Sequence, residues 1–149
     1  MTQQITALST EHLDSVWRIE QLAHTHPWSE TMIRNVKSRG AMHYVLIIDN
    51  HVVGYFYAQN IVGEVTLLNI AIDPGQQGKG YGKFLLEEFV TLCEQASAES
   101  AWLEVRASNT VAHQLYLNSG FNEVDRRINY YPSAQGREDA IIMSYFFFG

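Results

Sequence analysis

Cysteine, proline and basic residues are all scarce in this chain of 149 residues. A single cysteine, Cys93, cannot form an intrachain disulfide, and with six scattered histidines it supplies no four-ligand zinc spacing. We therefore expect a reducing compartment and no metal. Three prolines and 46% hydrophobic residues exclude general disorder. Ten Lys and Arg against sixteen Asp and Glu give a net charge of -6, which disfavours nucleic acids and anionic membranes as partners.

Long apolar runs are also absent. Runs such as residues 44–48 and 140–143 are far shorter than the roughly 20 residues that span a bilayer. Residues 1–6 have neither the positive start nor the apolar stretch of a secretory signal, so we expect a cytoplasmic protein. No linker, charge block or repeat divides the chain, and a single domain over residues 1–149 is expected.

Hydrophobic periodicity predicts an α/β order with a mixed sheet. A first helix is expected over residues 10–24, capped by Thr10, with Leu22 among its buried positions, and a second helix is expected from Ser29 to Gly40. The remaining predicted elements are three consecutive antiparallel strands at 44–48, 52–58 and 65–72, a helix at 81–95, a strand at 101–105, a helix at 109–119, and closing strands at 121–130 and 140–148.

The strongest local motif is the glycine-rich segment from Gln77 to Gly82, between a predicted strand and a long helix. Glycines allow positive φ and close backbone approach, and a helix N-terminus offers free N–H donors, so a pyrophosphate is the expected guest. A turn without a ligand is the alternative. A P-loop is disfavoured because no Ser or Thr follows Gly-Lys, and a dinucleotide fingerprint is disfavoured because Lys83 stands where its third glycine belongs.

The same segment resembles the acetyl-CoA loop of the GNAT N-acetyltransferase superfamily, whose pattern is Gln or Arg, two residues, Gly, one residue, then Gly or Ala. Three further segments resemble the RimI family within it: Pro27-Trp28-Ser29-Glu30, residues 102–106, and Asn129-Tyr130-Tyr131-Pro132 followed by residues 136–140. The resemblance runs from the first helix to the last strand. RimI enzymes acetylate the N-terminal alanine of the eighteenth protein of the small ribosomal subunit.

This resemblance implies a GNAT fold, in which a mixed, mostly antiparallel central sheet is flanked by helices. It also implies acetyl-CoA as cosubstrate and direct attack by the acceptor amine in a ternary complex. The implied catalytic residues are Glu104 as base and Tyr116 as acid, and Tyr130 and Tyr131 are the implied acceptor-binding residues. The implied acetyl-CoA contacts are Ile70, Ala71, Ile72, Gln77, Gly78, Lys79, Gly80, Tyr81, Gly82, Lys83 and Asn109.

The catalytic candidates also have structural explanations. Glu104 is the only charge in the strand 101–105, which suits a partly buried base, but a solvent-facing Glu paired with Arg106 gives the same pattern. Tyr116 lies on an apolar stripe, where most tyrosines belong to the core. Asn109 is a good helix N-cap whether or not it contacts a cofactor.

Two alternative functions stay open at this point: acetylation of a small-molecule amine, and a catalytically silent acetyl-CoA-binding domain. The presence of both Glu104 and Tyr116 favours an enzyme. The histidines, His24 among them, are expected to be solvated surface residues. Nothing in the sequence fixes the oligomeric state.

Overall fold

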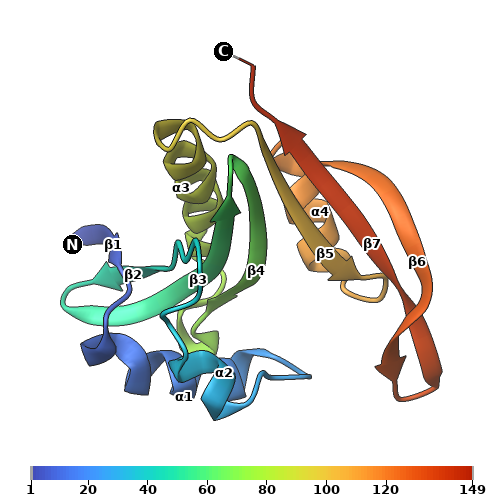
Figure 1. Ribbon diagram of the computed structural model, residues 1–149. Coiled ribbons are helices and arrows are strands. Elements are labelled where there is room, and N and C mark those ends of the chain that lie inside the picture. The colour runs from blue at the N-terminus through green and yellow to red at the C-terminus, as the bar shows by residue number, and fades with distance from the viewer. Residues whose placement is uncertain (1, 149) are drawn as a thin grey trace.

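The computed structural model describes residues 2–148 as a seven-stranded sheet flanked by helices (Figure 1). The strand order is β1-β2-β3-β4-β5-β7-β6, and every neighbouring pair is antiparallel except β4 and β5. The strands are β1 (Gln3–Ala7), β2 (Tyr44–Ile48), β3 (His51–Ile61), β4 (Glu64–Ile72), β5 (Ser100–Arg106), β6 (Asn122–Ser133) and β7 (Gly136–Phe146). The helices are η1 (Thr10–His12), α1 (Leu13–Ala23), α2 (Glu30–Arg34), η2 (Pro74–Gln76), α3 (Tyr81–Gln95) and α4 (Thr110–Asn118). Within residues 2–148, no helix is long and apolar enough to cross a bilayer.

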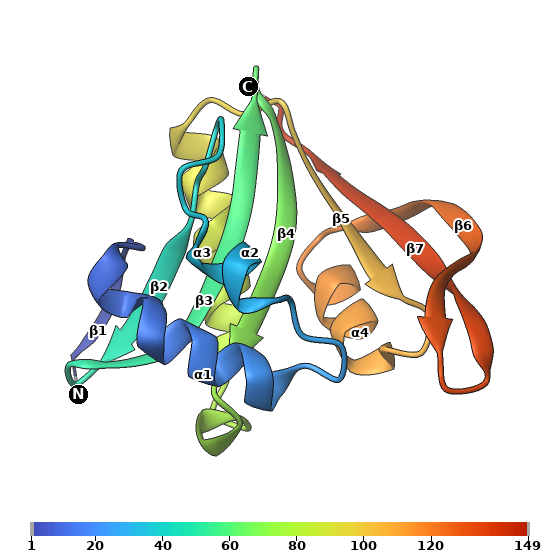
Figure 2. The ribbon, with the colours of Figure 1, turned by 60° about the horizontal axis from the view of Figure 1, so that its bottom comes forward.

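The helices cover both faces of the sheet (Figure 2). On one face, Leu85 and Phe89 of α3 and Tyr116 of α4 pack against β3, β4, β5 and β7. On the other face, Val16 and Ile19 of α1 and Ile33 of α2 pack against β2, β3 and β4. Cys93 is fully buried among the α3 residues, and burial raises the pKa of its thiol to about 12.

The sheet opens between β4 and β5, its one parallel pair. These strands pair only from Glu64–Thr66 to Ser100–Trp102, and they diverge beyond that point in both ribbon views (Figures 1 and 2). Residues 67–72 of β4 therefore pair with β3 on one side but not with β5 on the other. The divergence exposes a backbone edge and creates space in the middle of the sheet.

A β-bulge changes which side chains of β4 face each helix layer. Tyr57 pairs with Asn69 and Ala58 pairs with Leu67, which leaves Leu68 as an extra residue. An extra residue reverses the alternation of the side chains that follow it. Val65 and Leu67 therefore join the α3 core, whereas Asn69 and Ala71 turn towards α1.

The mixed, mostly antiparallel sheet flanked by helices is confirmed. The sequence did not indicate β1, because Ile5 is its only bulky apolar residue and the strand lies at the edge of the sheet. Thr10 was wrong as the first cap: Ser9 occupies the N-cap position of η1, and α1 begins only at Leu13. Leu22 was wrong as a buried residue, since it is 60% exposed.

The second helix is shorter than predicted. Ser29 caps α2, as expected, by accepting a hydrogen bond from the Met32 amide. The helix ends at Arg34, and the Tyr57 hydroxyl donates to the Ile33 carbonyl at 2.6 Å, which gives a partner to a group that a longer helix would bond to the amide of residue 37.

The closing hairpin is longer than predicted. The sequence predicts closing strands only up to residue 130 and from residue 140, but Pro132 and Ser133 belong to β6, and Ser133 pairs with Gly136. Tyr131 consequently lies on the same strand as Tyr130 rather than in the connection that follows it.

Candidate active site

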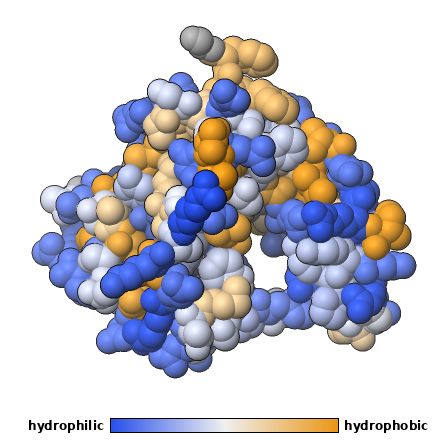
Figure 3. All heavy atoms as spheres, viewed as in Figure 1, coloured by the Kyte–Doolittle hydropathy of each residue, from blue (hydrophilic) through white to orange (hydrophobic). Residues whose placement is uncertain are grey.

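A cleft of about 860 Å³ occupies the gap between β4 and β5. Its walls are the end of α1 and the segment that joins α1 to α2, the free edge of β4, the glycine loop with the start of α3, the end of β5, α4, and the β6–β7 hairpin. Figure 3 shows an opening between the body of the molecule and the end of this hairpin. Most of the predicted site residues line the cleft: Ile70, Ala71, Ile72, Gln77, Gly78, Gly80, Tyr81, Gly82, Glu104, Asn109, Tyr116 and Tyr131.

The glycine loop forms a cradle at the start of α3. Gly78 and Gly80 adopt φ values of 80° and 82°, a region that disfavours residues with a side chain. A Cβ atom built on either glycine has no other atom of the described chain within 4 Å, so both face open space. Gly80 is the N-cap of the 15-residue helix α3 and has no side chain to bond the first amides. Free amides, open space and the helix dipole together suit an anion.

Two other cleft walls offer polar backbone and side-chain groups. Ile70, Ala71 and Ile72 lie on the edge of β4 that β5 leaves unpaired, where an extended chain can add as a further strand. Asn109 caps α4, accepting from the Ala112 amide at 3.2 Å, and it also lines the cleft. Its capping role, predicted from the sequence, is therefore confirmed, and its position leaves it facing the cleft.

Glu104 lies on the face of β5 opposite its buried neighbours Leu103 and Val105. Its side chain is 31% exposed, with one oxygen 3.4 Å from Arg127 Nε and the other accepting a long, 3.4 Å hydrogen bond from the Tyr131 hydroxyl. The alternative pairing with Arg106 is wrong. Arg106 instead lies 3.4 Å from Glu138 and donates to the Pro132 carbonyl at 2.8 Å.

Tyr116 lies across the cleft on α4. The residue is 7% exposed, its ring packs edge-on against Phe121, and it lines the cleft. Burial raises the pKa of its hydroxyl to about 12. The phenol therefore keeps its proton at neutral pH, as a proton donor must.

A bulge in β6 sets the direction of the two hairpin tyrosines. Three residues, 128–130, stand opposite Asp139 alone, and Asn129 has a φ of 54° with its amide bonded to the Asp139 carboxylate at 3.0 Å. Tyr131 is half-buried and lies under the Arg106 guanidinium, 4.3 Å from its ring centroid. Burial and the nearby Glu104 charge raise the pKa of Tyr131. Strand alternation predicts that one of the two tyrosines packs inward, and Tyr131 packs inward against the cleft.

Three predicted residues do not line the cleft. Tyr130 is 43% exposed and packs against Tyr131 and Arg127 outside it. Lys79 donates to Gln76 at 2.9 Å, and Lys83 lies 4.0 Å from Glu87 on the exposed side of α3.

Sequence reasoning missed several polar residues of the cleft, among them Glu20, His24, Arg106 and Glu138. The sequence did carry a signal for Glu20, because it lies four residues after Val16 on the apolar stripe of α1, and the structure leaves it only 1% exposed. Burial of a charged residue on such a stripe points to polar partners. The expectation that His24 is a solvated surface residue was wrong, since it bonds Asn69 at 2.8 Å.

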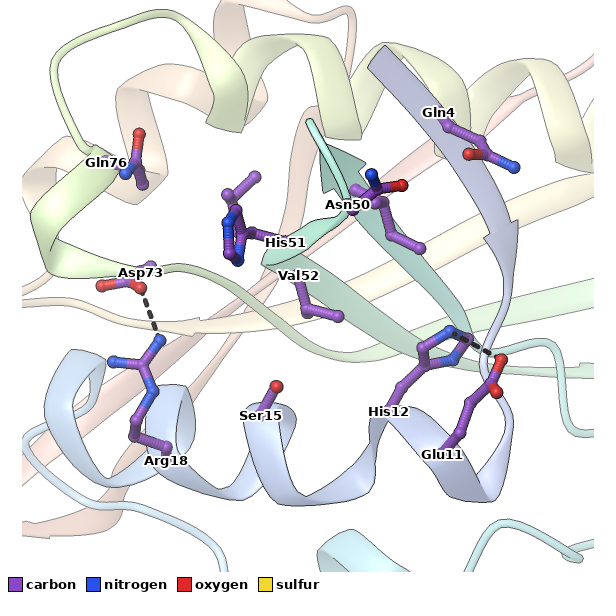
Figure 4. A pocket seen from close by; sticks show the side chains of 12 residues that line it. Gln4, Glu11, His12, Ser15, Arg18, Asn50, His51, Val52, Asp73 and Gln76 are labelled. Carbon is purple, nitrogen blue, oxygen red and sulfur yellow. Dashed lines mark hydrogen bonds and ion pairs between the residues drawn. The ribbon is translucent and has the colours of Figure 1, made fainter. Parts of the chain in front are cut away.

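A second cavity of about 700 Å³ lies between α1 and the turn joining β2 to β3 (Figure 4). Its lining includes none of the predicted site residues. Arg18 of α1 bonds Asp73 there at 2.7 Å (Figure 4). Asp73 also accepts from the Gly75 amide at 3.0 Å. Arg18 holds the pKa of this carboxyl below its usual value. The pair ties α1 to the chain just before the glycine loop.

Within residues 2–148, no three His, Cys, Asp or Glu side chains are grouped to hold a metal ion. The acetyltransferase (GNAT) family model matches residues 13–121, and the chain belongs to this family.

Several relatives are much more similar than the family as a whole. The chain is 44% identical over 140 residues to the ribosomal protein bS18-alanine N-acetyltransferase of Salmonella typhimurium, covering 94% of this chain and 95% of that protein. It is 42% identical over 142 residues to the Haemophilus influenzae protein of the same name, covering 95% and 94%. The crystal structure of the ribosomal-protein-S18-alanine N-acetyltransferase from Escherichia coli matches with a TM-score of 0.93 and 39% identity, covering 99% of this chain and 97% of that one. The predicted GNAT fold and the resemblance to the RimI family are confirmed.

Proposed function

We propose that this protein transfers the acetyl group of acetyl-CoA to the α-amine of the N-terminal alanine of ribosomal protein bS18. The observation that carries the proposal is one cleft that joins an anion cradle, a carboxylate and a protonated phenol. The relatives named for this reaction match over 94% or more of the chain, so the similarity includes every wall of the cleft.

Acetyl-CoA fits the cleft in two places. Its pyrophosphate suits the free amides of α3 beside Gly78 and Gly80, where open space replaces side chains. Its extended pantetheine arm carries amide groups that can pair with the unpaired edge of β4 at residues 70–72. Asn109 at the start of α4 offers a further polar contact. We assign Lys79 and Lys83 only long-range attraction for the phosphates, because neither lines the cleft.

Glu104 is the proposed general base. The acceptor's α-ammonium has a pKa of roughly 8 and must lose a proton before nitrogen attacks the thioester carbonyl. The Glu104 carboxylate is partly exposed in the cleft, and its neighbours Arg127 and Tyr131 fix its orientation. Tyr116 is the proposed acid, which gives its proton to the departing thiolate of CoA, directly or through one water. No covalent intermediate on the protein is needed.

The acceptor is proposed to enter between the α1–α2 segment and the β6–β7 hairpin. Tyr131 lies in the cleft beside Glu104, and Tyr130 packs on its outer side. A small first residue suits this position, because the amine must reach the thioester between Glu104 and the hairpin. Tyr130 and Tyr131 are the proposed contacts for the residues that follow.

A direct test incubates the purified protein with acetyl-CoA and a peptide that reproduces the amino terminus of bS18 with an internal lysine. Tandem mass spectrometry then locates the acetyl group. The proposal predicts acetyl on the α-amine only, and no reaction with a peptide whose α-amine is blocked. Acetylation of free polyamines in preference to the peptide would favour the small-molecule alternative, and binding of acetyl-CoA without transfer would favour the silent domain.

A further inference from the structure

A buried carboxylate lies at the wall of the cleft and has no part in the proposed proton transfers. Glu20 of α1 is 1% exposed. One of its oxygens accepts from the Tyr55 hydroxyl at 2.5 Å and from Asn69 Nδ2 at 2.8 Å, and the other accepts from the Trp28 amide at 2.9 Å. Burial, followed by the bond to Glu20, raises the pKa of Tyr55, so its hydroxyl stays a donor. A buried carboxylate is stable only with such partners.

This carboxylate fixes the orientation of the Asn69 amide. A carboxylate only accepts hydrogen bonds, so the NH₂ group of Asn69 must face Glu20 and its carbonyl oxygen must face away. The bulge at Leu68 is what turns Asn69 towards α1. On the far side, Asn69 Oδ1 lies 2.8 Å from His24 Nε2.

The Asn69 carbonyl in turn fixes the tautomer of His24. Because Oδ1 only accepts, Nε2 of His24 must carry the hydrogen. A neutral imidazole with its hydrogen on Nε2 has an acceptor lone pair on Nδ1. The one hydrogen bond of this ring within residues 2–148 is through Nε2, and the side chain is 32% exposed in the cleft.

We propose that His24 binds the acceptor, with Nδ1 accepting a hydrogen bond from an N–H group at the amino end of the polypeptide. Glu20 and Asn69 are positioning residues that act through His24. The inference rests on the proposed function, since it assigns a group to the acceptor half of the same cleft. His24 lies where α1 ends, so the helix and the sheet both hold it, whereas Tyr131 of the hairpin lines the other side of the cleft.

Two substitutions of His24 distinguish a role in binding the acceptor from a role in holding Asn69 in place. In His24→Gln, the amide nitrogen takes the place of Nε2 and still donates to Asn69, but the Nδ1 acceptor is lost. In His24→Asn, an oxygen takes the place of Nδ1, but the side chain is too short to reach Asn69. One hydrogen bond corresponds to roughly a tenfold change in binding. We expect His24→Gln to raise the KM for the bS18 peptide about tenfold, with an unchanged Kd for acetyl-CoA and an unchanged Tm, and His24→Asn to raise this KM less.

A purely supporting role predicts the reverse order. A His24→Gln enzyme with wild-type peptide KM, or one in which peptide KM and acetyl-CoA Kd rise together, would overturn the proposal. Nitrogen NMR of histidine-labelled protein gives a test that needs no turnover: we expect the Nε2-protonated tautomer, and a shift of the Nδ1 signal when peptide is added with CoA. The Nδ1-protonated tautomer would also overturn it. If the wild-type protein acetylates no peptide, the proposed function fails instead.

Discussion

Replacing Glu104 by Gln separates catalysis from stability. The substitution keeps the shape of the side chain and removes the proposed base. Its ion pair with Arg127 is long, at 3.4 Å, and the two side chains are 31% and 50% exposed. Pairs of this kind contribute about 0–1 kcal/mol, so the free energy of unfolding should change little. Loss of a general base lowers kcat/KM by about 10² to 10⁴, which corresponds to about 3–5 kcal/mol in the barrier.

Glu123→Gln is the matched control for this substitution. Glu123 lies on β6, is 36% exposed, and lies 2.9 Å from Arg126 Nε, but it does not line the cleft. Its removal should leave kcat/KM unchanged. The assay is single-turnover acetylation of the bS18 peptide, in which chemistry limits the rate, with Tm measured in parallel. A Glu104→Gln enzyme with the wild-type single-turnover rate would refute the base assignment, and an equal loss in both variants would attribute the effect to charge alone.

Three further predictions concern the acid, the loop and the acceptor. Tyr116→Phe should lower kcat with little change in acetyl-CoA affinity. A single-turnover rate equal to that of the wild-type protein would contradict the role of Tyr116 as the acid. Gly80→Val should weaken acetyl-CoA binding measured by calorimetry. Gly63→Val is the control: Gly63 has a φ of 85° in the turn between β3 and β4, so the substitution carries similar backbone strain but should leave acetyl-CoA binding unchanged. Equal affinities of the two variants would contradict the assignment of the glycine loop to the pyrophosphate. Because the net charge is -6, peptides that begin Ala-Arg should be acetylated in preference to peptides that begin Ala-Glu at low salt. This preference should shrink as the Debye length falls from about 10 Å at 0.1 M to about 3 Å at 1 M. Equal use of the two peptides at both salt concentrations would contradict this prediction.

The central strands were predictable because their side chains carry the signal. Residues 44–48 and 65–72 are mostly β-branched or apolar and are bounded by turn residues, and the structure contains β2 and β4 there. β1 carries no such signal, because an edge strand with one bulky apolar residue gains its stability from pairing with β2. The bulge at Leu68 lies inside one predicted strand, between Leu67 and Asn69, and no local pattern marks the reversal that sends Asn69 towards α1.

The candidate site likewise contains one part that the sequence predicts and one part that it does not. Gln77 to Gly82 was predictable because glycine spacing encodes a backbone shape directly, and the φ values of Gly78 and Gly80 fit that shape. Contacts between distant segments were not predictable: Glu104 pairs with Arg127 rather than with Arg106, its neighbour two residues along the strand. The link from Glu20 through Asn69 to His24 joins α1 to β4 across 45 residues or more, a proximity that only the fold creates.

The most direct test of the central claim is the mass of bS18 itself, from ribosomes of cells that lack this protein. We predict that the bS18 of these cells is lighter by one acetyl group at its N-terminal alanine. We also predict that the wild-type gene restores the group while the Glu104→Gln gene does not. Full acetylation of bS18 in the cells without the protein would contradict the account, as would restoration by the Glu104→Gln variant.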